Sequence, residues 1–197
     1  MFKKTTNRTH KPQVNSMPLL FDLKKTYVKS PIQIAKPSLK QVLKTSNDSN
    51  SEFMSWGKPI WIFLHSLASN IKNDYFVINR KEILRIVYSV CTNLPCHICS
   101  EHAKHYLDSI NFNNIQTCDK LITELYLFHN VVNKRKNYIL FQQNDLVKYN
   151  SVNMKNIIND FIKAYNVNNK LNIYSLSRQQ SFQFIKKWLH QNYQHIM

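Results

Sequence analysis

Two cysteines separated by two residues are the clearest sign of chemistry in this sequence. Cys96 and Cys99 follow Pro95, at a position predicted to be the first turn of a helix. Two thiols at this spacing can form a disulfide reversibly, with the transfer of two electrons. The backbone N–H groups and the dipole at a helix start stabilise a thiolate. Zinc sites use the same spacing, so the pair by itself indicates either redox chemistry or metal binding.

A zinc site would need further ligands, and His102 and His105 follow the cysteines at intervals of three residues. In a continuous helix, the segment from Cys96 to His105 rises about 13 Å over roughly two and a half turns. That separation is too large for a tetrahedral shell, in which every ligand lies about 2–2.3 Å from the zinc ion. The intervening residues give no sign of an irregular segment, so we expect no metal site here.

Aromatic and polar side chains in two other predicted helices have the spacing of a site for a flat ligand. Trp61 and His65 lie four residues apart and therefore project from one helix face. His129 and Asn133 have the same spacing, and Lys136 continues this polar stripe within a run of three cations that would suit a diphosphate. The alternatives are a core tryptophan beside a hydrogen-bonded histidine, and a solvated basic helix end whose cations favour the C-terminal dipole.

The chain carries a formal net charge of +16 over 197 residues, and the positive excess is greatest in residues 1–50. That segment contains ten Lys or Arg against Asp22 and Asp48 only. We interpret it as a basic, extended or disordered arm that is attracted to polyanions, nucleic acid among them. The sequence shows neither an apolar secretion signal at its front nor an uninterrupted apolar stretch of membrane-spanning length. We therefore expect a protein that is not secreted, and whose four cysteines serve redox or metal chemistry rather than a disulfide scaffold.

From Ser55 onward the apolar spacing is helical throughout and predicts an all-α bundle. Helices are expected at about 55–72, 79–94, 96–110, 117–136, 153–165 and 177–195. The second is expected to start at Asn79, because Glu82 three residues later completes a capping-box pattern. The last carries an apolar stripe, which we expect to pack on the bundle rather than to bind a partner. Cys91 and Cys118 are expected to be buried small side chains or free thiols.

Three motifs occur together and in order: Trp56-Gly57 with Trp61, Leu64 and His65; Pro95-Cys96-x-x-Cys99; and His129-Asn130-x-x-Asn133. Their combination resembles the Erv/ALR family of FAD-linked sulfhydryl (thiol) oxidases, in particular the short forms that large DNA viruses encode. The resemblance covers about residues 53–167. It implies a helical bundle, commonly a homodimer, with a four-helix FAD-binding core and a fifth short helix. The chain would then comprise the arm at 1–50, an FAD-binding oxidase domain at 51–168 and a C-terminal helical extension at 169–197.

Carried over by motif position, the resemblance implies a role for each site residue. Cys99 would be the cysteine next to the flavin, and Cys96 the exposed partner that exchanges disulfides with substrate. Gly57 is the single glycine of the chain, at a position where we expect a side chain to be excluded sterically. The residues implied to bind FAD are Trp61, His65, Cys99, His129 and Asn133, with Gly57, Lys58, Asn130 and Lys136 as further candidates.

The resemblance also implies a reaction and its partners. A substrate dithiol would reduce the disulfide of the pair, and FAD would pass the two electrons to dioxygen, giving hydrogen peroxide. Many cellular members carry a second Cys-x-x-Cys shuttle, which this sequence lacks, so an external thiol protein must supply the electrons, such as a virion protein or a relay protein. The expected location is the host cytoplasm or nucleus, with packaging in the virion as a further option. The competing hypothesis is a basic helical module that binds nucleic acid or zinc without catalytic activity.

Overall fold

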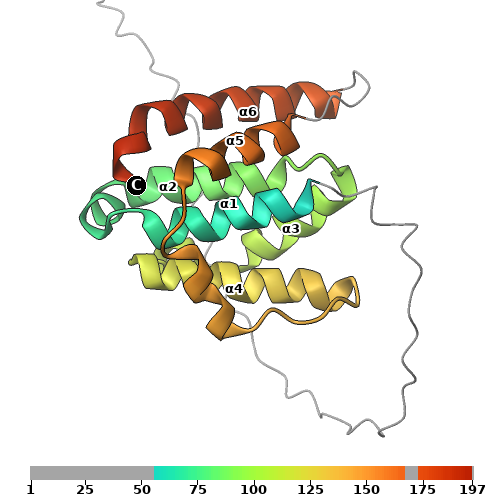
Figure 1. Cartoon of the computed structure of the whole chain (residues 1–197). Coiled ribbons are helices and arrows are strands. Elements are labelled where there is room, and N and C mark those ends of the chain that lie inside the picture. Colours follow the sequence, from blue (N-terminus) through green and yellow to red (C-terminus); the bar gives the residue numbers. More distant parts are fainter. Residues whose placement is uncertain (1–55, 167–172, 197) are drawn as a thin grey trace, which may run out of the picture. The chain divides into compact units, whose positions relative to one another are not determined.

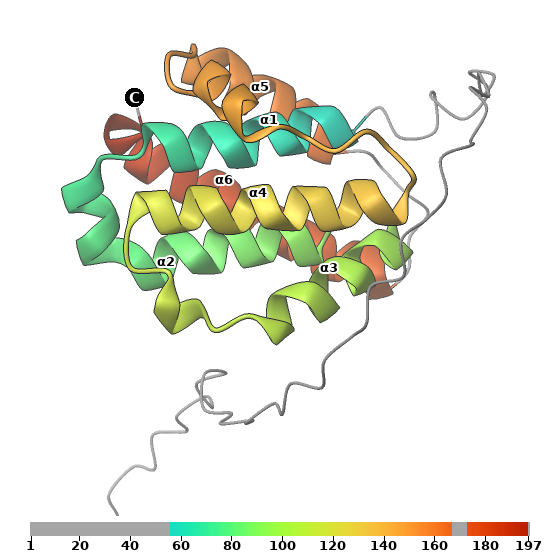
Figure 2. The same cartoon turned by 90° about the horizontal axis from the view of Figure 1, so that it is seen from below.

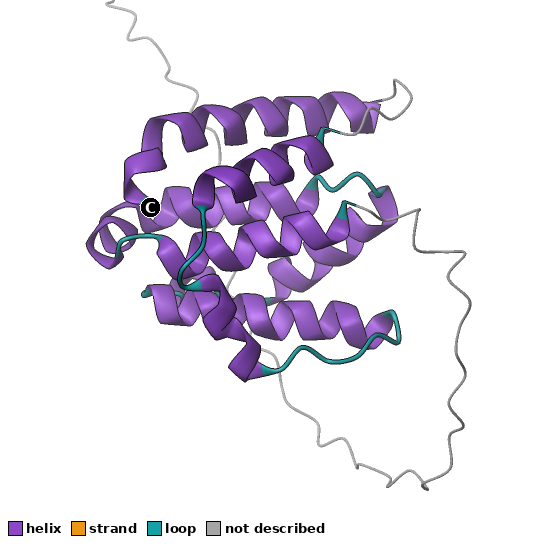
Figure 3. Ribbon diagram, in the orientation of Figure 1, coloured by secondary structure: helices purple, strands orange, loops and turns teal. Residues whose placement is uncertain are grey.

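The computed structural model describes residues 56–166 and 173–196 of the chain. These residues form helices joined by loops and contain no strand, so the prediction of an all-α protein is confirmed (Figure 3). The predicted arm at 1–50 and the boundary between residues 168 and 169 lie outside the described residues. The helices are α1 (Gly57–Asn70), α2 (Asn73–Thr92), α3 (His97–Ser109), η2 (Phe112–Asn114), α4 (Cys118–Arg135), η3 (Gln143–Tyr149), α5 (Met154–Tyr165), α6 (Ile173–Asn192) and η4 (Tyr193–His195).

The helices enclose one apolar core. α1 lies between α4 and α5, while α2 contacts both α3 and α6 (Figures 1 and 2). Phe63 of α1 stacks on Phe161 of α5 with ring centroids 4.0 Å apart, and neither side chain is exposed. Ile86 of α2 and Ile185 of α6 are likewise fully buried. Burial of these apolar surfaces is the main force that holds the helices together. No helix of the described residues is both long enough and apolar enough to cross a membrane.

The start of α2 differs from the prediction. The helix begins at Asn73, and Asn79 lies inside it with φ −103° and ψ 15°. The amide of Asn79 donates to the carbonyl oxygen of Tyr75 (3.1 Å), and α2 is kinked at this residue, so the predicted start coincides with the junction of two helical segments. The earlier start is explained by Phe76, whose side chain is completely buried and fixes the first turn against the core.

Two other helix starts agree with the predicted positions because polar side chains cap them. The hydroxyl oxygen of Thr117 accepts a hydrogen bond from the Lys120 N–H (3.3 Å) and caps α4. The side-chain oxygen of Asn153 accepts from the Asn156 N–H (3.1 Å) and caps α5. Each cap satisfies a backbone donor that the helix itself leaves unpaired.

The C-terminal helix α6 is an integral part of the core, as predicted from its apolar stripe. Trp188 is 2% exposed and Ile185 is not exposed at all. The turn that follows α6 is fastened to the start of α2. The Lys72 N–H donates to the His195 carbonyl oxygen, and the Lys72 ammonium donates to that of Gln194, each at 3.0 Å.

Candidate active site

The two cysteines of the predicted redox pair are bonded to each other at the start of α3. Their Cα atoms are 5.2 Å apart. Cys96 is the N-cap of the helix, and its Sγ accepts a hydrogen bond from the Cys99 N–H at 3.2 Å. Both cysteines are half-buried, while His97 and Ile98 between them are exposed, Ile98 by 69%. The disulfide is therefore partly accessible from the side of the turn.

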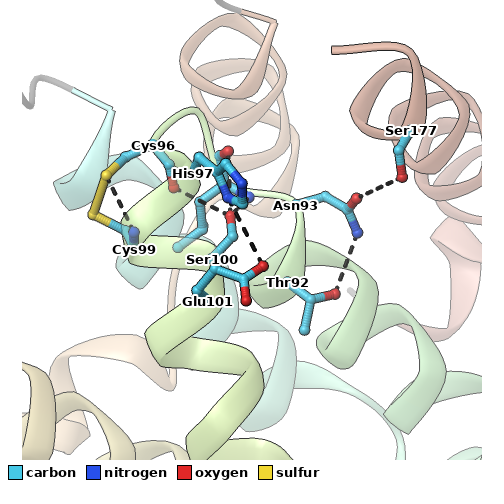
Figure 4. A network of polar contacts seen from close by, with 9 residues as sticks. Thr92, Asn93, Cys96, His97, Cys99, Ser100, Glu101 and Ser177 are labelled. Atoms are coloured by element: carbon cyan, nitrogen blue, oxygen red, sulfur yellow. Dashed lines mark hydrogen bonds and ion pairs between the residues drawn. A yellow bond between two sulfur atoms is a disulfide. The ribbon is translucent and has the colours of Figure 1, made fainter. Parts of the chain in front are cut away.

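The turn that carries Cys96 is held by polar contacts from two neighbouring segments (Figure 4). The hydroxyl of Ser100, on the first turn of α3, accepts a hydrogen bond from the Leu94 N–H at 2.8 Å. At the end of α2, the Asn93 amide donates to the Ser89 carbonyl oxygen at 3.0 Å. These contacts anchor the turn at both ends.

A cluster of aromatic and imidazole rings brings together the predicted faces of α1 and α4. Trp61 and His129 stack with ring centroids 4.0 Å apart and an interplanar angle of 7°. Nε2 of His65 and Nδ1 of His129 share a hydrogen bond of 3.0 Å. Phe128 connects this ring cluster to α3. Its ring centroid lies 5.3 Å from that of Trp61, and its ring stacks on Tyr106 of α3 with centroids 4.7 Å apart.

Both imidazoles of the ring cluster are neutral near pH 7. Burial, and to a smaller extent the charges of His129 and Lys148, lowers the pKa of His65 to about 3. Burial and the charge of Lys148 lower the pKa of His129 to about 4. In a neutral pair one ring donates the shared proton and the other accepts it. Within the described part of the chain, the other ring nitrogen of His65, Nδ1, is buried without a hydrogen-bond partner.

The segment from the end of α4 to η3 completes the ring cluster, although it was not predicted from the sequence. The ring centroid of Phe141 lies 5.4 Å from that of His65 and 5.2 Å from that of His129. Tyr149 stacks on His65 at 5.0 Å, and the Lys148 ammonium lies 4.7 Å from the Phe141 ring centroid. This segment has neither helical periodicity nor a motif. Its aromatic residues next to a cation were the one signal available in the sequence.

Asn130 and Asn133 were predicted to line a cofactor, and their amides bond the main chain of this segment. The Asn130 side chain accepts from the Phe141 N–H (2.8 Å) and donates to the Phe141 carbonyl oxygen (3.0 Å). The Asn133 amide donates to the Ile139 carbonyl oxygen at 3.2 Å. Asn130 of α4 thus holds Phe141 beside the two histidines.

The other predicted binding residues lie at the ends of α1 and α4. A Cβ added to Gly57 would meet no atom of the described residues within 4 Å, so these residues leave room for a side chain there. Lys58 is exposed beside it. Lys136 is half-buried, and burial, followed by the charge of Arg135, lowers its pKa. The Arg135 guanidinium donates to Nδ1 of His102 at 2.6 Å and so joins the end of α4 to α3.

The remaining cysteines and the proposed zinc ligands occupy separate places. Cys91 is buried and Cys118 half-buried, and both are free thiols, as expected. Helix α3 is regular throughout, which is the geometry that carries His105 away from Cys96. Across the described ranges, no group of three or more His, Cys, Asp or Glu side chains is arranged to hold a metal ion.

Comparison with known proteins identifies the family. The sequence profile of the Erv1 / Alr family matches residues 58–151. Among viral proteins named as FAD-linked sulfhydryl oxidases, 096R of Invertebrate iridescent virus 3 is 29% identical over 84 residues, which are 42% of this chain and 56% of that protein. FPV093 of Fowlpox virus (strain NVSL) is 32% identical over 73 residues, or 37% of this chain and 68% of that protein. 088R of Frog virus 3 (isolate Goorha) is 29% identical over 103 residues, which are 48% of this chain and 67% of that protein.

The matched region spans little more than half the length of the iridescent virus protein. No solved structure matches the chain. The family profile includes both cysteines of the pair and the histidines of the ring cluster. The chain therefore belongs to the Erv1/Alr family.

Proposed function

We propose that this chain is an FAD-linked thiol oxidase that forms disulfide bonds in protein substrates. The observation that carries the proposal is the half-buried disulfide between Cys96 and Cys99, formed at a helix N-terminus inside the region that the family profile matches. The names of the three viral relatives support the same reaction class.

The first stage is an exchange between substrate thiols and the Cys96–Cys99 disulfide. A substrate thiolate attacks Sγ of Cys96, the bond between the two cysteines breaks, and Cys99 leaves as a thiolate. A second substrate thiol loses its proton and attacks the substrate sulfur of this mixed disulfide. The substrate then leaves with a disulfide of its own, and Cys96 is released as a thiolate. Two electrons have passed from the substrate to the pair, and two protons to solvent or to the cysteines.

The start of α3 favours the charged products of this exchange. The Cys99 N–H that donates to Sγ of Cys96 in the oxidised protein would donate to a Cys96 thiolate after reduction. Thiolates at a helix N-terminus are further stabilised by the helix dipole. The neighbouring Ile98 offers an apolar contact to the substrate around its reacting cysteine, because most of this side chain is exposed.

The ring cluster fits FAD, which combines flat aromatic rings with a diphosphate. Trp61 and His129 are half-buried aromatic rings, and Nδ1 of the buried His65 is a polar atom that a ligand would satisfy. Lys148, whose ammonium lies 4.7 Å from the Phe141 ring centroid, supplies positive charge at the ring cluster. The chemistry that FAD supplies when bound is acceptance of two electrons from the reduced cysteines and their delivery to dioxygen, as hydrogen peroxide. Because both histidines stay neutral, they contribute hydrogen bonds and ring contacts without adding charge.

Purified protein tests the proposal directly. It should be yellow with a flavin spectrum and should consume oxygen in the presence of dithiothreitol. Cys99→Ser should abolish oxygen uptake while flavin stays bound. The matched control is Cys118→Ser, a half-buried free cysteine outside the pair, which should keep the wild-type rate. A colourless folded protein, or a Cys99→Ser variant that still consumes oxygen, would refute the proposal.

The same proposal covers partners and location. We propose thiol-containing proteins as electron donors and dioxygen as acceptor. Three points stay predictions: the homodimer, the contact of the basic arm with nucleic acid, and the location in host cytoplasm or nucleus. The oligomeric state can be measured by light scattering on the full chain.

A further inference from the structure

Ser100 occupies an unusual place next to the redox pair. It follows Cys99 directly, its side chain is 1% exposed, and its hydroxyl points back to the turn before the helix (Figure 4). The hydroxyl oxygen accepts from the Leu94 N–H at 2.8 Å. Its own proton can be donated to the carbonyl oxygen of Cys96 (3.2 Å) or to that of Leu94 (3.4 Å). One buried hydroxyl therefore joins the first turn of α3 to the segment that carries Cys96.

These contacts bear on the distance between the two sulfurs. Cys99 and Ser100 are neighbours on α3, whereas Cys96 stands at the end of a turn that includes Pro95, which has no N–H to donate. The bonds from Ser100 therefore hold the backbone on the Cys96 side of the pair against the helix on the Cys99 side. When the disulfide is reduced, the same bonds limit how far the two thiols can separate.

The other end of the turn is anchored independently. The Asn93 amide donates to the Ser89 carbonyl oxygen at 3.0 Å, and its side-chain oxygen accepts from the Ser177 hydroxyl of α6 at 3.4 Å. The hydroxyl of Ser181 on α6 also donates to the Ser89 carbonyl oxygen (3.3 Å). The exit from α2 is fixed in this way, and the Cys96 carbonyl oxygen also accepts the Ser100 N–H at 3.0 Å. Between these two points the Ser100 hydroxyl ties the turn to α3 at Leu94.

We infer that Ser100 is a positioning residue of the redox pair, which keeps the two thiols close and so favours their disulfide. The inference rests on the proposed function, because that proposal makes the Cys96–Cys99 pair the redox site. Ser100 takes no part in the exchange itself. It raises the effective concentration of one thiol near the other, as preorganisation does in other intramolecular reactions.

The reduction potential of the pair tests this role without reference to flavin or oxygen. Full-length protein is equilibrated anaerobically with glutathione buffers of known ratio and quenched by alkylation, and the reduced fraction of the pair is measured by mass spectrometry. Ser100→Ala should lower the equilibrium constant for disulfide formation by about five- to tenfold, and tenfold is about 30 mV for two electrons. The potential would become less negative by up to that amount. If the protein binds no flavin, the proposed oxidase activity is refuted, but the reduction potential of the pair can still be measured.

Matched controls separate positioning from a general loss of stability. Ser66→Ala removes an equally buried hydroxyl from α1, which makes no hydrogen bond to any described group, and should leave the potential unchanged. Ser100→Thr and Ser100→Val add the same volume, but only threonine keeps the hydroxyl, so the threonine variant should have the potential nearer to wild type. This second pair decides the question if Ser100→Ala does not fold. A wild-type potential in Ser100→Ala, or equal potentials in the threonine and valine variants, would overturn the inference.

Discussion

The buried imidazole of His65 should make the folded chain sensitive to mild acid. Its side chain is 1% exposed, and its pKa is lowered to about 3 in the fold, from about 6.5 in an unfolded chain. Between these two values the unfolded chain binds a proton that the folded chain excludes. The stability contributed by the neutral ring is therefore complete above about pH 6.5 and is lost progressively as the pH falls toward 3.

The size of the effect follows from the separation of the two pKa values. At pH 5 the unfolded imidazole is about 1.5 pH units below its pKa, and each unit is worth about 1.4 kcal/mol, so His65 alone should cost ~2 kcal/mol relative to pH 8. His129 acts in the same direction, because burial also lowers its pKa. Its ring is more exposed, so its contribution is smaller.

Urea unfolding of the oxidised protein at pH 8 and at pH 5 measures this loss. In His65→Gln the difference in unfolding free energy between the two pH values should be smaller than in wild type by ~2 kcal/mol. The control is His97→Gln, at an exposed histidine beside the redox pair, which should keep the wild-type difference. If His65→Gln loses as much stability between pH 8 and pH 5 as wild type does, the ring is not held neutral by burial and the reasoning fails.

Three further predictions concern other parts of the bundle. Asn130→Ala removes both side-chain bonds to Phe141 and should speed hydrogen exchange of the Phe141 amide, measured by mass spectrometry, while the helices keep their protection. Trp188→Ala should lower the unfolding free energy by ~3–5 kcal/mol in urea, because it empties a fully packed site between α6 and the core. Burial raises the pKa of Cys91 to about 12, so at pH 8 a thiol reagent should modify Cys118 in the folded protein and Cys91 only after unfolding.

The sequence predicted those features of the fold that a few neighbouring residues determine. Helical periodicity predicted the bundle because it reports which face of each helix is buried. Thr117 and Asn153 marked helix starts because a cap acts within three residues. The segment of α2 before the kink at Asn79 was missed for the opposite reason, since it depends on burial of Phe76 in the tertiary core.

The redox pair and the ring cluster differ in the same way: the first depends on a short stretch of sequence and the second on contacts between distant residues. The redox pair was identifiable because its chemistry and its helix start occupy four consecutive residues. The ring cluster depends on a contact between residues 64 positions apart, His65 and His129, and on a segment that no periodicity marks. A polar side chain on a helix can face either a ligand or a loop, and Asn130, for which the family resemblance implied contact with FAD, bonds the main chain of Phe141. Residues that act through the main chain of a loop are therefore the part of such a site that a motif cannot reveal, and substitutions at Phe141 or Asn130 should impair ligand binding with every motif cysteine and histidine intact.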